Sequence, residues 1–169
     1  MSVAEKIDTS QFLTFRLAED VFAIDVIMAK EVLDFADVTK VPQTPDYMLG
    51  VINLRGSVVP VIDMRLKFGM ADVEMTRDSC IIVVEVDVDG EPITVGALAD
   101  SVQEVMDMSE SQIEPPPRIG TRLNTEFIKG MGNLGEKFVI ILDINKVFSV
   151  DDLEFAKSVG EEVEATTEQ

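Results

Sequence analysis

Part of the chain is repeated, and this repeat limits the possible folds more than any other feature. Residues 48–56 match residues 128–136 at an offset of 80 positions, and residues 31–34 match residues 104–107 at an offset of 73. A longer loop around the three prolines at 115–117 accounts for the difference. At the offset of 80, the identical pairs are Gly50/Gly130, Asn53/Asn133, Leu54/Leu134, Val59/Val139, Asp63/Asp143 and Phe68/Phe148. A repeat of this kind indicates the architecture before any other feature does.

The repeat predicts two similar small β-units in tandem. Neither unit is large enough to bury a good core alone, so we expect them to pack around a shared apolar seam with a groove on one side. In residues 11–17, Leu13, Phe15 and Leu17 alternate with polar residues, as in a half-buried strand. Segments rich in β-branched residues predict further strands at 21–26, 48–54, 58–62, 80–88, 93–98 and 137–142.

Turn and cap residues separate these segments. Asp89-Gly90 predicts a hairpin turn, and Pro60 inside a strand-like run favours an edge strand or a bulge. Asp63 and Asp143 each follow an apolar strand and are predicted N-caps of short helices. Residues 149–152 resemble a capping box, with Asp in place of the usual Glu or Gln, opening a final helix to about residue 158. The fold class predicted is therefore all-β with short helices and a C-terminal helix.

Composition excludes several classes of function. The net charge of −18 would repel phosphate backbones and anionic lipids, so we expect no nucleic-acid binding and no direct membrane binding. The chain has no histidine, the commonest general base and metal ligand, so we expect no catalytic residues, no metal and no cofactor. Its single cysteine, Cys80, lies in an apolar run and is interpreted as a small buried hydrophobic residue. The first residues lack a secretory pattern and no apolar run is long enough to span a membrane, which favours a cytoplasmic location.

One segment carries a specific resemblance. In residues 50–56 the pattern Gly-x-x-Asn-Leu-Arg-Gly is followed by an apolar strand containing Pro60, and then by Asp63-x-Arg65. Four other segments, at residues 22–25, 31–32, 96–100 and 130–135, match further motifs of the same protein family. From about residue 10 to residue 155, the chain resembles the CheW family of chemotaxis coupling proteins.

The resemblance implies a fold of two pseudo-repeated, five-stranded SH3-like β-barrels packed on a shared core. It implies a flexible N-terminus at 1–9 and a CheW-like domain at 10–155, made of two intertwined barrel subdomains with a repeat boundary near 75–80. Residues 156–169 would be the helix end and an acidic tail. The implied function is an adaptor that couples the histidine kinase CheA, through its regulatory domain, to the tips of methyl-accepting chemotaxis receptors in arrays. The chain itself has no Gly-rich phosphate loop with Lys and no phosphorylatable His.

The repeat also separates structural residues from candidate binding residues. A residue found in both units is interpreted as needed by the fold, which applies to Gly50, Asn53 and Leu54; Gly56 completes this structural turn motif. Arg55 does not recur, because Gly135 takes its place. From sequence alone Arg55 could be a solvated turn residue, but the family's arginine at this turn supports receptor coupling.

The resemblance places four further receptor-binding residues with Arg55: Ala29, Glu31, Val102 and Val105. We hypothesise that Glu31 and Arg55 form an ion pair that shapes a groove between the barrels, where an amphipathic receptor hairpin could bind. Glu104 matches Glu31 in the repeat, which leaves a structural or solvated acid as the alternative. Ordinary core packing is the alternative for the apolar residues, and Val102→Asp is expected to abolish receptor binding without unfolding. Contacts with CheA are expected at apolar patches on the barrel ends.

Three other functions remain open. The chain could be a CheW-like adaptor in a non-flagellar pathway, such as surface motility or second-messenger signalling. It could be an enzyme that uses paired acids, Asp151 with Asp152 or Asp34 with Asp37. It could also be an acidic mimic of nucleic acid, although its acids are not ordered along one face.

Overall fold

The computed structural model describes residues 9–35, 38–42, 45–69, 76–88, 90–115 and 127–148. Strands dominate these residues, with four short helices among them. In chain order the elements are β1 (Thr9–Leu17), β2 (Asp20–Asp25), η1 (Val26–Met28), β3 (Ala29–Asp34), β4 (Met48–Leu54), β5 (Ser57–Asp63), α2 (Met64–Lys67), β6 (Cys80–Val88), β7 (Glu91–Ala99), β8 (Ser101–Ser109), η2 (Glu110–Gln112), β9 (Ile113–Glu114), β10 (Ile128–Asn133), β11 (Phe138–Leu142) and α3 (Ile144–Val147).

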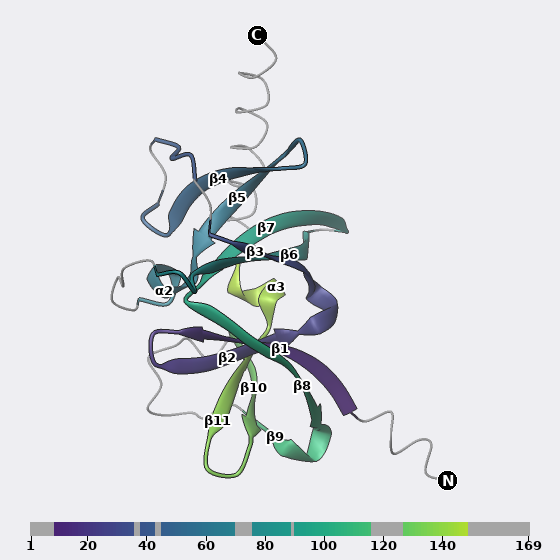
Figure 1. The fold of residues 1–169 in the computed structure, drawn as a ribbon. Helices are drawn as coiled ribbons and strands as arrows, with labels where there is room; N and C mark the ends of the chain where they lie inside the picture. The colour runs from purple at the N-terminus through teal and green to yellow at the C-terminus, as the bar shows by residue number, and fades with distance from the viewer. Residues whose placement is uncertain are drawn as a thin grey trace.

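The strands form two sheets, stacked one above the other in Figure 1. The five-stranded sheet has the order β3-β6-β7-β5-β4 and is called the first barrel here. The six-stranded sheet has the order β8-β1-β2-β11-β10-β9 and is called the second barrel. Both barrels are antiparallel except for one parallel pair each, β5 with β7 and β11 with β2. The predicted all-β fold of two barrels is therefore confirmed.

The two repeat units exchange their first hairpins. Hairpin β1–β2 comes from the first unit but pairs with β8 and β11 of the second. Hairpin β6–β7 comes from the second unit but pairs with β3 and β5 of the first. Each barrel thus contains strands from both halves of the chain, so neither half can close a barrel alone.

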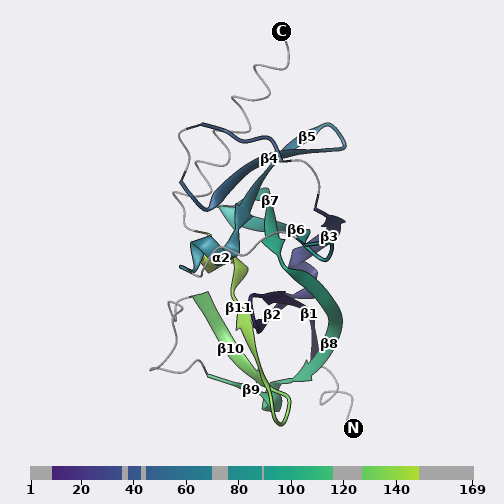
Figure 2. The same cartoon turned by 60° about the vertical axis from the view of Figure 1, so that its left-hand side comes forward.

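Each sheet closes on itself through a continuation of its own edge strand. After β3 the chain returns at Thr39, which exchanges two backbone hydrogen bonds with Val51 of β4, at N···O distances of 2.9 and 2.8 Å. In the second barrel β8 curves toward β9, and β9 pairs with β10 at Met131 and Gly132 (Figure 2). The same device closes both barrels, as expected for two repeated units.

Two repeated glycines allow these closing segments to pass. A Cβ atom at Gly50 would lie 2.1 Å from the carbonyl oxygen of Thr39, and φ at Gly50 is +148°. A Cβ atom at Gly130 would lie 2.7 Å from Cγ2 of Ile113 in β9. Real Cβ atoms do not approach so closely, so the identity of these two positions reflects the barrel closure.

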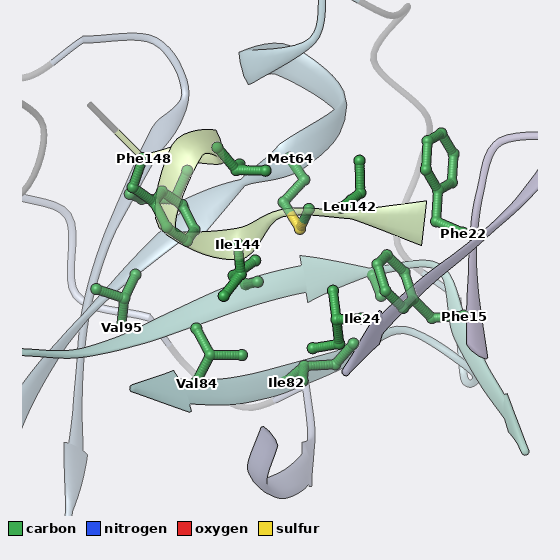
Figure 3. Close-up of a cluster of buried hydrophobic side chains, with 14 of the residues drawn as sticks. Phe15, Phe22, Ile24, Met64, Ile82, Val84, Val95, Leu142, Ile144 and Phe148 are labelled. Carbon is green, nitrogen blue, oxygen red and sulfur yellow. The ribbon is translucent and has the colours of Figure 1, made fainter. Parts of the chain in front are cut away.

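One apolar cluster joins the two barrels (Figure 3). Helix α2 follows β5 of the first barrel, and Phe68 at its end stacks on Phe22 of the second barrel with ring centroids 6.1 Å apart. In return α3 follows β11 of the second barrel, and its Ile144 lies in the same cluster as Val84 and Val95 of the first. The shared apolar seam predicted from the repeat is present, and the two short helices complete it reciprocally.

Most predicted strands match the structure. The predicted limits of β4 and β6 agree with the observed ones, and five other strands agree within two residues. Strands β3, β8, β9 and β10 were not predicted. In β3 and β8 most outward positions are polar or charged, with Val32 and Val105 as the exceptions, and β10 contains two glycines, so their pattern is less apolar than that of the other strands. Asp63 and Asp143 do cap α2 and α3, accepting from the amides two residues later at 2.9 and 3.2 Å.

The expectation for Pro60 was wrong. Its strand, β5, lies between β4 and β7 and is not an edge, and the register shift of the β4–β5 pair falls between Met48 and Gly50. Val51, opposite Pro60, uses its amide and carbonyl to bond Thr39, so the pair Val51–Pro60 is not hydrogen-bonded. The ladder with β7 begins only at Val61. The missing amide of Pro60 therefore breaks no ladder bond.

Several expectations concern residues outside the described ranges. These are the N-terminal residues 1–8, residue 75 at the start of the repeat boundary predicted near 75–80, Asp89 of the predicted hairpin turn, the prolines at 116–117, the final helix expected from residue 149 and the acidic tail to residue 169.

Candidate functional site

Arg55 lies at the tip of the β4–β5 hairpin, in a backbone conformation that favours glycine. Leu54 pairs with Ser57, so Arg55 and Gly56 form a two-residue turn with φ values of 51° and 88°. Two consecutive positive φ values are what a type I′ turn requires, and Asn-Gly is its preferred sequence. The side chain of Asn53 accepts a hydrogen bond from the Gly56 amide at 2.8 Å and closes the turn.

The second repeat unit shows what this turn needs. In the β10–β11 hairpin, Gly135 occupies the position of Arg55, with φ of 94°, and its amide donates to Oδ1 of Asn133 at 2.9 Å. In this second turn only the first residue has positive φ, whereas both residues do in the turn at 55–56. Glycine nevertheless occupies the first position there, so a two-residue turn at this place does not require an arginine side chain. A non-glycine residue held at positive φ is a reason to look for a function.

Arg55 forms the ion pair expected with Glu31. Its Nη1 and Nη2 atoms donate to the two carboxylate oxygens of Glu31 in β3 at 2.9 and 3.0 Å. The hydrogen bond and the negative charge of Glu31 raise the pKa of Arg55 above its usual value. The side chain of Arg55 is 73% exposed and that of Glu31 27% exposed, so the pair adds little stability. Its effect is to fix a planar guanidinium group over β3.

The apolar candidates lie on two repeat-related strands, β3 of the first barrel and β8 of the second. Ala29 and Val102 are half-buried, and both pack against the cluster shared by the barrels. Val105 is 50% exposed, and its repeat counterpart Val32 is 43% exposed. An aspartate at position 102 would place a charge against the shared cluster. Val105→Asp is therefore the substitution that tests binding without disturbing the core.

A depression of about 460 Å³ opens at one end of the second barrel. None of the five residues predicted to bind receptor lines it. The depression is lined instead by residues such as Arg16, Met106, Leu134, Lys137 and the half-exposed Phe138. Since the lining mixes cations, acids and apolar side chains, its chemistry does not identify a ligand.

The turn motif residues lie in structural positions. Leu54 is half-buried and packs against the first barrel's own cluster, formed by Ile52, Val59, Val61, Ile81, Val83 and Leu98.

Cys80 is buried in the shared cluster, as expected. Burial, followed by the negative charge of Asp34, raises the pKa of its thiol.

Sequence analysis missed a buried charged cluster, formed by Asp63, Arg65 and Asp100. Arg65 is 0% exposed, and its guanidinium donates to Asp63 through Nε at 3.1 Å and Nη2 at 3.0 Å. Its Nη1 donates to Asp100 at 2.9 Å. The repeat could have identified this cluster, because Arg65 does not recur: the second unit has Asn145 at the matching position.

Comparison with known proteins identifies the family. A model of the CheW-like domain matches residues 11–152. The chain belongs to the CheW family. A chemotaxis protein CheW of Klebsiella aerogenes is 35% identical over 150 residues, covering 89% of this chain and 88% of that protein. The CheW of Thermotoga maritima is 30% identical over 149 residues, covering 86% and 92%.

A solved structure agrees with the fold of this CheW-family chain. The crystal structure of the scaffolding protein TtCheW from Thermoanaerobacter tengcongensis matches with a TM-score of 0.76 and 36% identity, covering 85% of this chain and 90% of that one. This match supports two SH3-like barrels. Within the described ranges, none of the helices has the length and apolar character needed to cross a membrane. Of the acid pairs considered for catalysis, Asp37, Asp151 and Asp152 lie outside the described residues.

Proposed function

We propose that this chain is a chemotaxis adaptor that couples the histidine kinase CheA to the tips of methyl-accepting chemotaxis receptors. It works in the cytoplasm, assembles in receptor arrays and catalyses no reaction. The observation that carries the proposal is the match to the CheW-like domain over residues 11–152. The relatives are named for chemotaxis and one is named a scaffolding protein, which favours this pathway over surface motility or second-messenger signalling.

The receptor-binding surface is centred on the Glu31–Arg55 ion pair. Arg55 stands where the repeat uses glycine, and Glu31 holds its guanidinium in a fixed orientation. Val105, with Ala29 and Val102 beside the shared core, supplies apolar area on β3 and β8. A helical hairpin lying across both barrels would meet the charged pair on the first barrel and the apolar Val105 on the second, which suits an amphipathic partner. The ion pair would then set the orientation of the receptor more than its affinity for the whole surface.

CheA is proposed to bind through its regulatory domain at apolar patches on the barrel ends. Assembly can be measured by analytical ultracentrifugation of the chain with that domain and a receptor signalling fragment. A ternary complex is expected at tens of micromolar, the range of moderate protein–protein affinities. Absence of any complex with either partner at that concentration would contradict the proposed function.

Arg55→Gly tests the receptor surface without harming the turn. This variant introduces the residue found at the matching position of the second hairpin, and it should melt at or above the wild-type temperature, because glycine adopts positive φ without strain. Receptor-fragment affinity should fall by more than about tenfold, a typical effect for a residue central to an interface. Arg77→Ala removes an exposed arginine elsewhere and is the matched control. Receptor binding within about twofold of wild type for Arg55→Gly would refute the role of Arg55.

Val105→Asp tests the apolar part of this surface. Because Val105 is 50% exposed, a charge there should leave the melting temperature nearly unchanged but exclude an apolar receptor side chain. Phe138→Asp is the control, since Phe138 is 51% exposed and lies outside the proposed receptor surface. Equal losses of receptor affinity in the two variants would show that Val105 has no specific role.

A further inference from the structure

Asp100 connects the two barrels through a single carboxylate. It lies in the crossover between β7 of the first barrel and β8 of the second. Its Oδ1 accepts from Nη1 of Arg65, which belongs to α2 of the first barrel, at 2.9 Å. Its Oδ2 accepts from the amide of Ala18, in the β1–β2 turn of the second barrel, at 2.6 Å. Its own amide donates to the carbonyl of Arg16 at 2.9 Å. The side chain therefore fixes an element of each barrel relative to the other.

The partner of Asp100 has a single orientation. Asp63 binds the Nε and Nη2 edge of Arg65, and Asp100 binds Nη1, so two carboxylates fix the plane of the guanidinium. Asp63 and Arg65 are 1% and 0% exposed, which excludes the alternative positions that a surface arginine samples. A planar group with several donors fixes geometry better than a flexible point charge does.

The opposite junction between the repeat units keeps only one of these three charges at the matching positions, since Asp63 recurs as Asp143 but Arg65 and Asp100 do not recur. Counterparts at the repeat offsets are Asn145 for Arg65 and Ile27 for Asp100. Ile27 is 81% exposed, and the side chain of Asn145 accepts a hydrogen bond from the Asp87 amide at 3.2 Å. At these positions the fold therefore forms one of its two junctions without a buried ion pair. Buried ion pairs can often be replaced by apolar residues without loss of stability, so stability alone does not explain the cluster.

We propose that the Asp63–Arg65–Asp100 cluster is a positioning device that fixes the orientation of the second barrel relative to the first. It thereby sets the spacing of β3 and β8, the strands that carry the proposed receptor-binding residues. Asp100 directly precedes β8 and lies two residues before Val102, so any movement of the crossover is transmitted directly to β8. The receptor part of this inference rests on the proposed function, whereas the part concerning barrel orientation does not.

The test removes the charges but keeps the shape. In the variant Asp63→Asn, Arg65→Met and Asp100→Asn, the asparagine at position 63 can still cap α2, and none of the three positions keeps a charge. Asp100→Asn alone is the second variant, in case the triple variant does not fold. Arg65 and Ala18 donate to different oxygens of Asp100, and asparagine has an acceptor at only one of these two positions, with a donor NH₂ group at the other. Glu85→Gln, which breaks an ion pair with Lys30 inside the first barrel, is the matched control.

Barrel orientation is measured by the distance between spin labels at Ser57→Cys and Lys137→Cys, in a Cys80→Val background. These exposed positions are repeat-related, one in each barrel. Wild type and Glu85→Gln should give one narrow distance distribution, and the cluster variants a distribution at least about twice as wide while melting cooperatively. Receptor-fragment affinity of the cluster variants should fall by more than about tenfold.

Each result has a defined meaning. A wild-type distribution in the folded cluster variants overturns the proposal. A widened distribution with wild-type receptor affinity overturns the link to the receptor. If wild-type protein itself does not bind the receptor fragment, the proposed function fails, but the distance distribution still decides whether the cluster positions the barrels.

Discussion

Gly50→Ala should be the most damaging of the single methyl additions in the hairpins of this chain. The added Cβ atom would lie 2.1 Å from the carbonyl oxygen and 2.7 Å from the carbonyl carbon of Thr39. Both contacts are with backbone, so no side-chain rotation can relieve them. The bridge between Thr39 and Val51, which closes the first barrel, must therefore move or break.

Two effects set the size of this destabilisation. Breaking the two Thr39–Val51 hydrogen bonds removes about 1 kcal/mol each. Holding alanine at a φ of +148° adds about 1–3 kcal/mol of strain. The sum is about 3–5 kcal/mol, and at about 3 °C per kcal/mol for a chain of this length the melting temperature should fall by about 10–15 °C.

Two other glycines provide graded controls. The alanine of Gly56→Ala meets no atom within 4 Å and has only the strain of φ +88°, so the melting temperature of this variant should fall by about 3–9 °C. Gly130→Ala meets Cγ2 of Ile113, a side chain that can rotate, and the Glu114 carbonyl at 3.1 Å, so its loss should be intermediate.

Far-UV circular dichroism is the suitable assay, since the chain has no tryptophan and one tyrosine. If Gly50→Ala melts no lower than Gly56→Ala, barrel closure is not what requires glycine at position 50.

Further predictions concern the core, the thiol and the turn. Phe68→Ala should lose about 3–5 kcal/mol in urea unfolding, because Phe68 is buried in the shared cluster, whereas Phe138→Ala should lose less than about 1 kcal/mol. Burial raises the pKa of the Cys80 thiol, so the folded state holds that proton more tightly than the unfolded state does. The resulting stability is complete below the unfolded thiol pKa of about 8.5 and is lost as pH rises through the folded pKa. Cys80→Val should therefore reduce the decline of melting temperature above about pH 8; an unchanged decline would contradict this. Asn53→Ala should lose about 1 kcal/mol, since the Gly56 amide loses its partner, and an unchanged urea midpoint would refute that role.

Local features were predicted well because their causes are local. The period of two in residues 11–17 and the cap at Asp63 each depend on a few neighbouring residues. Two predicted strands accordingly agree with β1 and β6, and the predicted cap at Asp63 agrees with the start of α2. Strands β3 and β8 were missed because most of their outward positions are polar or charged, and their place in a sheet depends on partners far along the chain.

The candidate site was predicted unevenly for the same reason. The repeat singled out Arg55, because a position that differs between two like units is not fixed by the fold, and the structure brings it to Glu31. Arg65 carries the same kind of charge in the sequence but is fully buried. Sequence patterns treat both as surface residues, since the burial of Arg65 depends on how α2 packs against the crossover at Asp100.

The amino-acid sequence by itself determined that this protein is a pair of like β-units with a common apolar seam. It also determined where the hairpins turn. Only the tertiary structure decided which hairpin joins which barrel, because β1–β2 and β6–β7 are near-equivalent and satisfy the same local pattern in either place. Pairing between distant strands is settled by the free energy of the whole packed core, in which no short segment specifies its partner.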